Sequence, residues 1–180
     1  MLNYNPVNFK EMSPSELCDY IAKRHHKYVR EEFGKISDHL KTALNVDVNS
    51  GPELRAIIKL FHELHDELEQ HFNKEEEILF PLVQQLIISE ETERAKKNLS
   101  VSIIDKPLEE MNKDHKKIER ILSEIRRLSH DYFLDPMSSP THKLCLNELF
   151  ALEDDLHKQF YLEENILTPK LITWEQTILS

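Results

Sequence analysis

A chain of 180 residues with 39% hydrophobic content can bury one core and is too short for two comfortable ones, so we expect a single domain covering residues 1–180. The net charge is −10 and the basic residues are scattered, which argues against nucleic acid as a partner. No apolar run approaches the roughly 20 residues that a membrane helix needs. Cys18 and Cys145 are isolated and the start has neither a basic nor an apolar region, so we expect a cytoplasmic protein with inert thiols.

The first predicted elements are two long helices. Ser13 and Glu16 enclose Pro14 in a capping box, which predicts a helix over residues 14–44. A second helix is expected over residues 52–90, and Pro81 should kink or end it. Glycine occurs only twice and Leu, Glu and Lys outnumber Val and Thr, which favours helices of this length over a sheet.

Two further helices are expected in the second half of the chain. Asp105 and Pro107 open one that covers residues 106–132, and a loop rich in Ser and Pro precedes the last one at residues 141–170. Four long amphipathic segments joined by modest loops predict an all-α fold, an antiparallel four-helix bundle.

An internal repeat relates the second and fourth predicted helices. Residues 65–81 recur as residues 153–169, displaced by 88 positions, and eight of the seventeen paired residues are identical. In the first copy His71 and Glu75 stand one helical turn apart, so an imidazole and a carboxylate share a face and suit a metal ion. The second copy keeps the carboxylate as Glu163 but carries Gln159 in place of the histidine.

Apolar residues at 3-4 spacing form one seam along each predicted helix, and polar residues interrupt every seam at its middle. In the second helix the seam is expected to continue beyond Glu75 through Ile78 and Leu82. The interruptions are His26, the pair His71 and Glu75, His115, and the pair Gln159 and Glu163. Burying such groups costs several kcal/mol unless a cation or a fully satisfied polar network offsets it.

The interruptions are themselves symmetric, since His26 and His115 lie 89 residues apart and each precedes one copy of the repeat. A complete version would present four imidazoles and two carboxylates, which suits two metal ions bridged by the Glu side chains. Nitrogen and oxygen ligands without a thiolate favour iron or manganese over structural zinc. The later members of the acidic runs, Glu76, Glu77 and Glu164, are expected to be solvated. The remaining histidines are also expected at the surface; they are His25, His39, His62, His65, His130, His142 and His157.

Four segments together resemble the hemerythrin-like di-iron proteins of the repair-of-iron-centres family, over nearly the whole chain. They are Ala22-Lys-Arg-His-His26-Lys-Tyr-Val-Arg-Glu-Glu-Phe33, His71-Phe-Asn-Lys-Glu75-Glu-Glu-Ile-Leu-Phe-Pro81, Met111-Asn-Lys-Asp-His115 and Asp155-Leu-His-Lys-Gln159-Phe-Tyr-Leu-Glu163-Glu-Asn-Ile-Leu167. Many members also carry a small N-terminal domain with a Cys-Cys motif, which we expect to be missing here. The resemblance implies a hemerythrin-like bundle that binds two non-haem iron ions, bridged by an oxo or hydroxo group, with manganese or zinc as substitutes.

The resemblance implies iron ligation by His26, His71, Glu75, His115 and Glu163. The last family motif usually has a second His at the position of Gln159. An amide oxygen binds iron less tightly than imidazole, so Gln159 either substitutes oxygen for nitrogen, makes one iron labile, or leaves one position vacant. His157 lies roughly 200° around the helix from that position and is expected to face away.

The function implied by the resemblance is repair of iron-sulfur clusters damaged by nitrosative or oxidative stress. The protein would deliver labile iron to damaged iron-sulfur proteins, as a metal-binding repair protein rather than an enzyme. An alternative is a sensor or redox module that binds oxygen or nitric oxide at an open iron position. A third is a bundle that has lost its metal and serves as an interaction scaffold.

Overall fold

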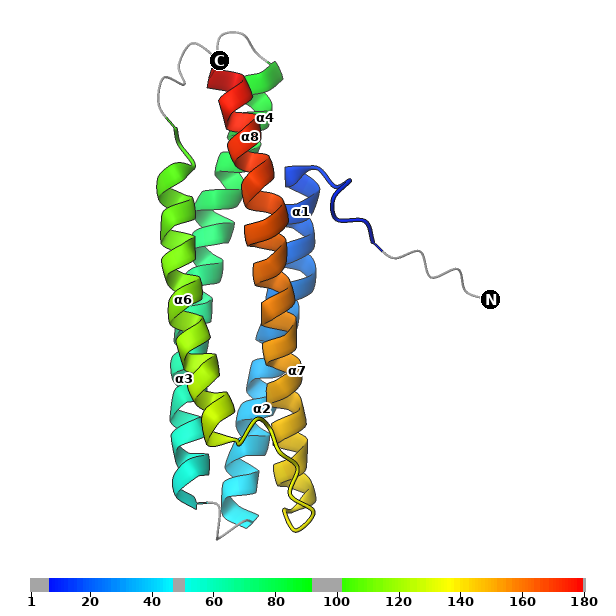
Figure 1. Ribbon diagram of the computed structural model, residues 1–180, viewed down its shortest axis with the longest axis vertical. Coiled ribbons are helices and arrows are strands. Elements are labelled where there is room, and N and C mark those ends of the chain that lie inside the picture. The colour runs from blue at the N-terminus through cyan, green and yellow to red at the C-terminus, as the bar shows by residue number, and fades with distance from the viewer. Residues whose placement is uncertain (1–6, 47–50, 92–101, 180) are drawn as a thin grey trace, which may run out of the picture.

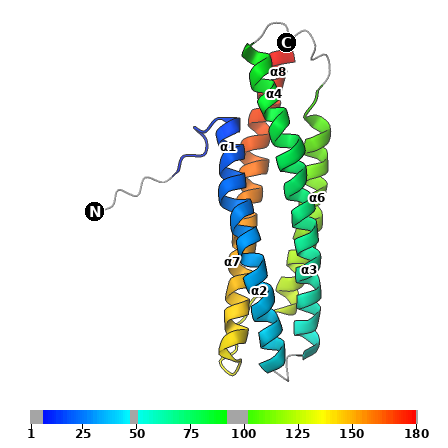
Figure 2. The same cartoon turned by 180° about the vertical axis from the view of Figure 1, so that it is seen from behind.

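The structure is a computed structural model that describes residues 7–46, 51–91 and 102–179. Within these residues the chain forms four helical rods and no strand, and Figures 1 and 2 show the rods packed lengthwise. The rods comprise α1 (Pro14–Tyr20), η1 (Ile21–His26) and α2 (Lys27–Val46); α3 (Gly51–Lys74), η3 (Glu75–Leu79) and α4 (Phe80–Glu91); α6 (Asp105–Leu128); and α7 (Pro140–Leu162), η4 (Glu163–Leu167) and α8 (Thr168–Leu179). The predicted all-α four-helix bundle is confirmed.

Side-chain caps fix two of the helix starts near their predicted positions. At α1 the backbone N–H of Glu16 donates to Oγ of Ser13 at 3.3 Å, and the N–H of Ser13 donates back to the Glu16 carboxylate at 2.8 Å. At α7 Oγ of Ser139 accepts from the N–H of His142 at 3.1 Å, and Pro140 takes the first helical position. These contacts satisfy amides that have no partner inside the helix.

A side chain from a distant helix caps α6. The buried Glu175 of α8 accepts from the backbone N–H of Ile103 at 2.8 Å and of Ile104 at 3.3 Å, and from the hydroxyl of Ser102 at 2.7 Å. A carboxylate at a helix N-terminus is also favoured by the helix dipole. The end of the chain is therefore tied to the start of the third rod.

The third and fourth rods end at positions other than those predicted. The third ends at Leu128 instead of 132, because His130, Asp131 and Tyr132 adopt positive φ angles of 51°, 57° and 57°. This left-handed turn breaks the helix and buries the Tyr132 ring beside Phe150. The fourth rod continues past residue 170 to Leu179, so Pro169 does not end it.

A π-helical turn ends two residues before each proline of the repeat. The N–H of Phe80 donates to the carbonyl of Glu75, and the N–H of Thr168 donates to the carbonyl of Glu163, both five residues back. At each proline the helix is changing back from π-helical to α-helical hydrogen bonds, so the regular pattern is already interrupted there. The missing amide of Pro81 therefore does not end the rod.

The π-helical turn also corrects the predicted seam of the second rod. Each such turn accommodates one extra residue, so every apolar position beyond it is displaced by one. Ile78 is 51% exposed, whereas Leu79, Val83 and Leu86 are buried. The same insertion shifts the burial pattern at the end of the fourth rod, where Leu167 and Leu171 are fully buried.

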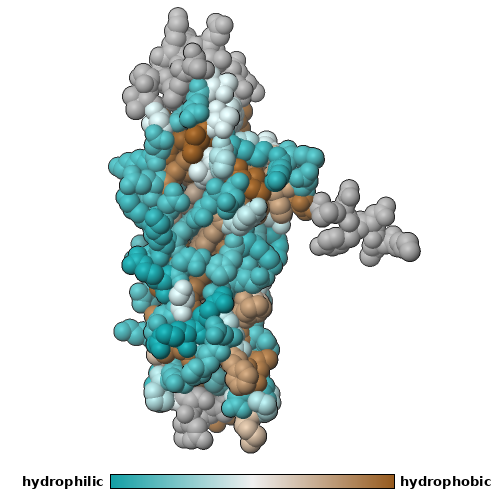
Figure 3. Space-filling view, in the orientation of Figure 1, coloured by the Kyte–Doolittle hydropathy of each residue, from teal (hydrophilic) through white to brown (hydrophobic). Residues whose placement is uncertain are grey.

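The buried apolar side chains form two clusters, one toward each end of the bundle. One includes Val29, Leu68 and Phe160, and the other includes Leu79 and Met111. The polar residues that interrupt the seams lie between them. Figure 3 shows mainly hydrophilic side chains on one face of the molecule. None of the helices in residues 7–46, 51–91 and 102–179 has both the length and the apolar character needed to cross a membrane.

Replacing Glu175 by alanine should lower the free energy of unfolding by about 1–3 kcal/mol, because it leaves the half-buried N–H of Ile103 and the buried N–H of Ile104 without an acceptor. Urea unfolding followed by circular dichroism measures the change. The matched control is Gln176→Ala, one residue further along α8 and exposed, which should alter stability little. Equal effects of the two substitutions would contradict the capping role.

Candidate metal centre

All six predicted site residues lie together in the middle of the bundle, and each is at most 2% exposed. His26 ends η1, His115 lies midway along α6, and His71 and Gln159 lie near the ends of α3 and α7. Glu75 and Glu163 each begin a π-helical turn, η3 and η4. These six are His26, His71, Glu75, His115, Gln159 and Glu163. The four rods therefore contribute one, two, one and two side chains.

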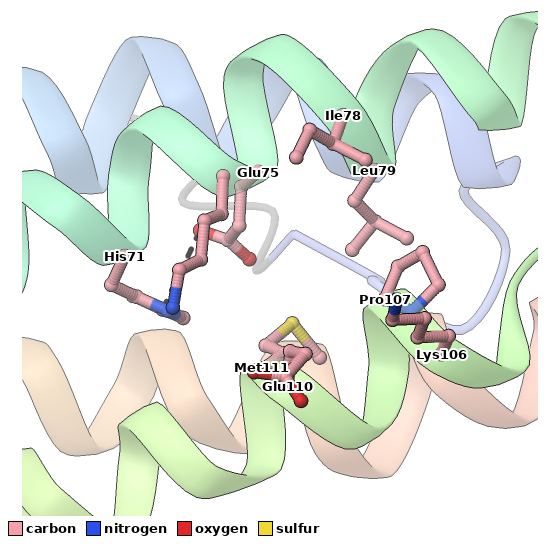
Figure 4. A pocket seen from close by; sticks show the side chains of 9 residues that line it. His71, Glu75, Ile78, Leu79, Lys106, Pro107, Glu110 and Met111 are labelled. Carbon is pink, nitrogen blue, oxygen red and sulfur yellow. Dashed lines mark ion pairs between the residues drawn. The ribbon is translucent and has the colours of Figure 1, made fainter.

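Imidazole nitrogens and carboxylate oxygens converge at short distances. Nε2 of His26 lies 3.0 Å from Oε2 of Glu75, and Nε2 of His115 lies 2.9 Å from Oε2 of Glu163. Nε2 of His71 lies 3.2 Å from that of His115, and 3.6 Å and 3.8 Å from the two carboxylates. Figure 4 shows His71 and Glu75 pointing toward one another from the same rod.

These atoms form two groups that share one residue. His71, His115 and Glu163 form the first group, and His26, Glu75 and Glu163 form the second. Within each group the ligand atoms lie within 4.8 Å of one another. Glu163 thus belongs to both, and Glu75 contacts a histidine of each group.

Many of these atoms have no hydrogen bond although they are fully buried. They are Nε2 of His26, both carboxylate oxygens of Glu75 and of Glu163, and both amide atoms of Gln159. Nε2 of His26 and Oε2 of Glu75 are 3.0 Å apart, yet their orientation is not that of a hydrogen bond. Buried polar atoms left unpaired are costly, and atoms that converge without pairing are satisfied by a cation between them. The residues therefore fit a metal centre.

Residues 19–171 match the family model of the hemerythrin HHE cation binding domain. The chain belongs to this family. It is 26% identical over 164 residues to the iron-sulfur cluster repair protein ScdA of Staphylococcus haemolyticus, covering 91% of this chain and 70% of ScdA. It is 27% identical over 161 residues to the iron-sulfur cluster repair protein YtfE of Escherichia coli, covering 89% of this chain and 67% of YtfE. The resemblance to the repair-of-iron-centres family is confirmed.

Two carboxylates outside the predicted set hold histidines of the hemerythrin site. Nδ1 of His26 lies 2.7 Å from Oε1 of Glu76, and Nδ1 of His115 lies 2.7 Å from Oε1 of Glu164. Both acids lie at least partly at the surface, as expected, but the sequence did not predict that each also reaches a buried imidazole. Such a bond fixes the ring and leaves Nε2 for a metal. The signal was present, because both copies of the repeat keep the Glu-Glu pair.

Charge balance inside the hemerythrin site shifts two ionisation equilibria in opposite directions. Burial alone would lower the pKa of His71, but Glu75, Asp114 and Glu163 raise it to about 10. Burial alone would raise the pKa of Glu163, but His115 and His71 lower it to about 2. Without metal, a proton on His71 supplies part of the positive charge that the carboxylates require. A metal ion must displace that proton, so binding should strengthen as pH rises.

One histidine expected at the surface is buried. His25 is 4% exposed, and its Nδ1 lies 2.9 Å from Oδ2 of the buried Asp155. His25 and His26 both face inward because they close η1, whose wider turn allows neighbouring side chains to share the interior. His62, His130 and His157 are exposed as expected, and His39, His65 and His142 are half-buried.

A mainly apolar cavity of about 320 Å³ opens beside the site, between η3 and the start of α6. His71 and Glu75 form its inner end, and Ile78 and Met111 form part of its walls. Figure 4 shows these side chains around the opening, with Glu110 beside Met111 and with Lys106 and Pro107 at the end away from His71. The cavity gives a small molecule a path to the buried imidazole and carboxylate.

The stability of the metal-free protein should pass through a maximum as pH changes. The raised pKa of His71 contributes stability fully below its ordinary 6.5, and this is lost as pH rises to about 10. The lowered pKa of Glu163 contributes stability above its ordinary 4.5, and this is lost as pH falls to about 2. The two contributions are therefore largest together between pH 4.5 and 6.5, and the melting temperature of the metal-free protein should be highest there.

His71→Gln removes one titrating group and provides the control. In that variant the decline between pH 6.5 and 10 should be clearly reduced, while the acid decline due to Glu163 persists in weakened form because His115 still contacts it. An alkaline decline of the same size in both proteins would contradict the assignment to His71.

Proposed function

We propose that this protein holds two iron ions in the six-residue cluster and donates iron for the repair of iron-sulfur clusters damaged by nitrosative or oxidative stress. The observation that carries this proposal is the pair of buried ligand groups that share Glu163 and leave their inward atoms unpaired. The family of cation-binding domains to which the chain belongs supports it.

The ligand groups suggest how two ions would be divided. His71 and His115 would hold one, and His26 and Gln159 would hold the other, with Glu75 and Glu163 contacting both. Bound iron supplies redox and ligand-exchange chemistry, while these side chains exclude water and set the affinity at each position. Nitrogen and oxygen donors of this kind also suit manganese and zinc, so iron is assigned by the family resemblance and the donor set together.

The repair role is supported by relatives over most of the chain, two of which are the iron-sulfur cluster repair proteins ScdA and YtfE. Donation is supported by Gln159, whose neutral amide binds iron more weakly than the imidazole found at that position in other members. The partners would be damaged iron-sulfur proteins of the cytoplasm, and the protein would act as a metal donor rather than as an enzyme.

Gln159→His should raise the iron content toward two per chain and slow the extraction of iron by a chelator, because a second imidazole completes the weaker position. Iron per chain after anaerobic loading and the time course of extraction measure both effects. Gln176→His, which adds an exposed histidine on α8, is the control and should behave like the wild type. Unchanged stoichiometry and unchanged extraction would contradict donation through Gln159, and a folded protein that takes up no iron would contradict the whole proposal.

A second candidate function is reversible binding of oxygen or nitric oxide, and the apolar cavity beside His71 and Glu75 favours it. Small uncharged molecules enter such a space more readily than a hydrated cation does. Ile78→Trp, at an exposed position of the cavity wall, should slow the optical change that follows addition of nitric oxide to the reduced, iron-loaded protein. Ile88→Trp, on the exposed surface of α4, is the control. The absence of any stoichiometric, reversible optical change would exclude this function.

A further inference from the structure

The carboxylate that holds His26 is itself held by an arginine. Nη1 of Arg30 donates to Oε1 of Glu76 at 2.8 Å, and Nε of Arg30 donates to Glu69 at 3.1 Å. The guanidinium also lies 5.4 Å from the ring centre of Phe72, which stacks on the His26 imidazole at 4.0 Å. Arg30 thus contacts both the carboxylate and the aromatic ring that fix His26.

In the other half of the bundle the corresponding positions carry the opposite residue types, an acid in place of the arginine and a histidine in place of the glutamate. The 89-residue displacement that relates His26 to His115 places Glu119 where Arg30 stands, and the repeat places His157 where Glu69 stands. Glu119 and His157 pair with each other at 3.2 Å. Among the described residues, no lysine or arginine lies within ion-pair distance of Glu164, the carboxylate that holds His115.

A carboxylate behind a metal-binding histidine makes the imidazole a stronger ligand. An arginine on that carboxylate occupies its lone pairs and cancels its charge, so this support is weaker at His26 than at His115. Behind His71, Nδ1 lies 3.8 Å from Oδ2 of Asp114, and Lys74 contacts that carboxylate at 2.7 Å. His71, however, shares its group with the imidazole of His115. His26 is grouped instead with the two carboxylates Glu75 and Glu163 and with no second imidazole.

We propose that Arg30 is a positioning residue that, together with Gln159, makes the metal at His26 the one that leaves first. This inference rests on the proposed two-metal site and names which ion is donated. Oε2 of Glu163 lies 2.9 Å from Nε2 of His115, so His71, His115 and Glu163 would still offer two imidazoles and a carboxylate to the remaining ion.

Arg30→Met tests the inference, because it keeps the apolar stem and removes the charge. Chelator extraction of iron from the loaded wild-type protein should show a fast and a slow phase. The substitution should slow the fast phase roughly tenfold and leave the slow phase unchanged. A merely structural role predicts the opposite sign, since loosening the site would speed release. Arg30→Lys, which keeps the charge, should retain the fast phase, and Arg120→Met on the exposed face of α6 is the matched control.

Two further variants assign the phases to the two positions. Glu76→Gln should speed the fast phase, and Glu164→Gln should speed the slow phase, because each weakens one histidine. Anaerobic titration with Co²⁺, followed by visible absorption, should show tighter binding of the second equivalent in Arg30→Met. A single extraction phase in the wild type, or an unchanged or faster fast phase in Arg30→Met, would overturn the inference. Failure of every variant to bind metal would instead overturn the proposed two-metal site.

Discussion

Burial of ionisable groups between two apolar clusters is the constraint on which the rest of the structure depends. Three imidazoles, two carboxylates and one amide lie at most 2% exposed, and several of their atoms have no partner. Burial removes them from bulk solvent, so a proton, as the raised pKa of His71 indicates, or a cation is needed to compensate the charge. The surrounding leucines and phenylalanines exclude solvent, which strengthens every interaction among the buried charges.

The backbone changes its hydrogen-bond pattern at the buried polar residues. Each carboxylate of the repeat begins such a turn, and His26 ends another, so three of the four rods change their hydrogen-bond spacing at the site. A turn of this kind weakens the helix locally and is retained where a functional group must be placed. Beyond it the buried face moves by one residue, and the packing of Leu79 and Leu167 follows from where Glu75 and Glu163 stand.

The sequence was sufficient to predict the four rods and the six polar residues at their middle, because 3-4 periodicity and a long repeat survive any local change of spacing. It was not sufficient to predict the π-helical turns, since no local motif distinguishes a bond five residues back from one four residues back. For this reason Ile78 was predicted on the buried seam although it is exposed, and the fourth helix was predicted to end at residue 170 although it continues to Leu179. The roles of His25, Glu76 and Glu175 depend on which other helix approaches them, and that depends on three-dimensional packing rather than on spacing.

Because the two halves are nearly symmetric, residues at corresponding positions can be compared directly. The backbones of residues 65–81 and 153–169 follow the same course through a π-helical turn and a proline, whereas His26 ends the π-helical turn η1 and His115 lies within the α-helix α6. Side-chain differences between the halves therefore add to this one backbone difference. In the proposed two-metal site Gln159 would weaken the position of His26, and Arg30, which donates to Glu76, would reduce the negative charge behind the same histidine. An iron donor must bind metal firmly and also release it, and a single binding position with one affinity meets both demands poorly. In the proposed site, two unequal positions that share Glu163 would divide these demands, since the stronger one would keep the shared carboxylate oriented while the weaker one exchanged its ion.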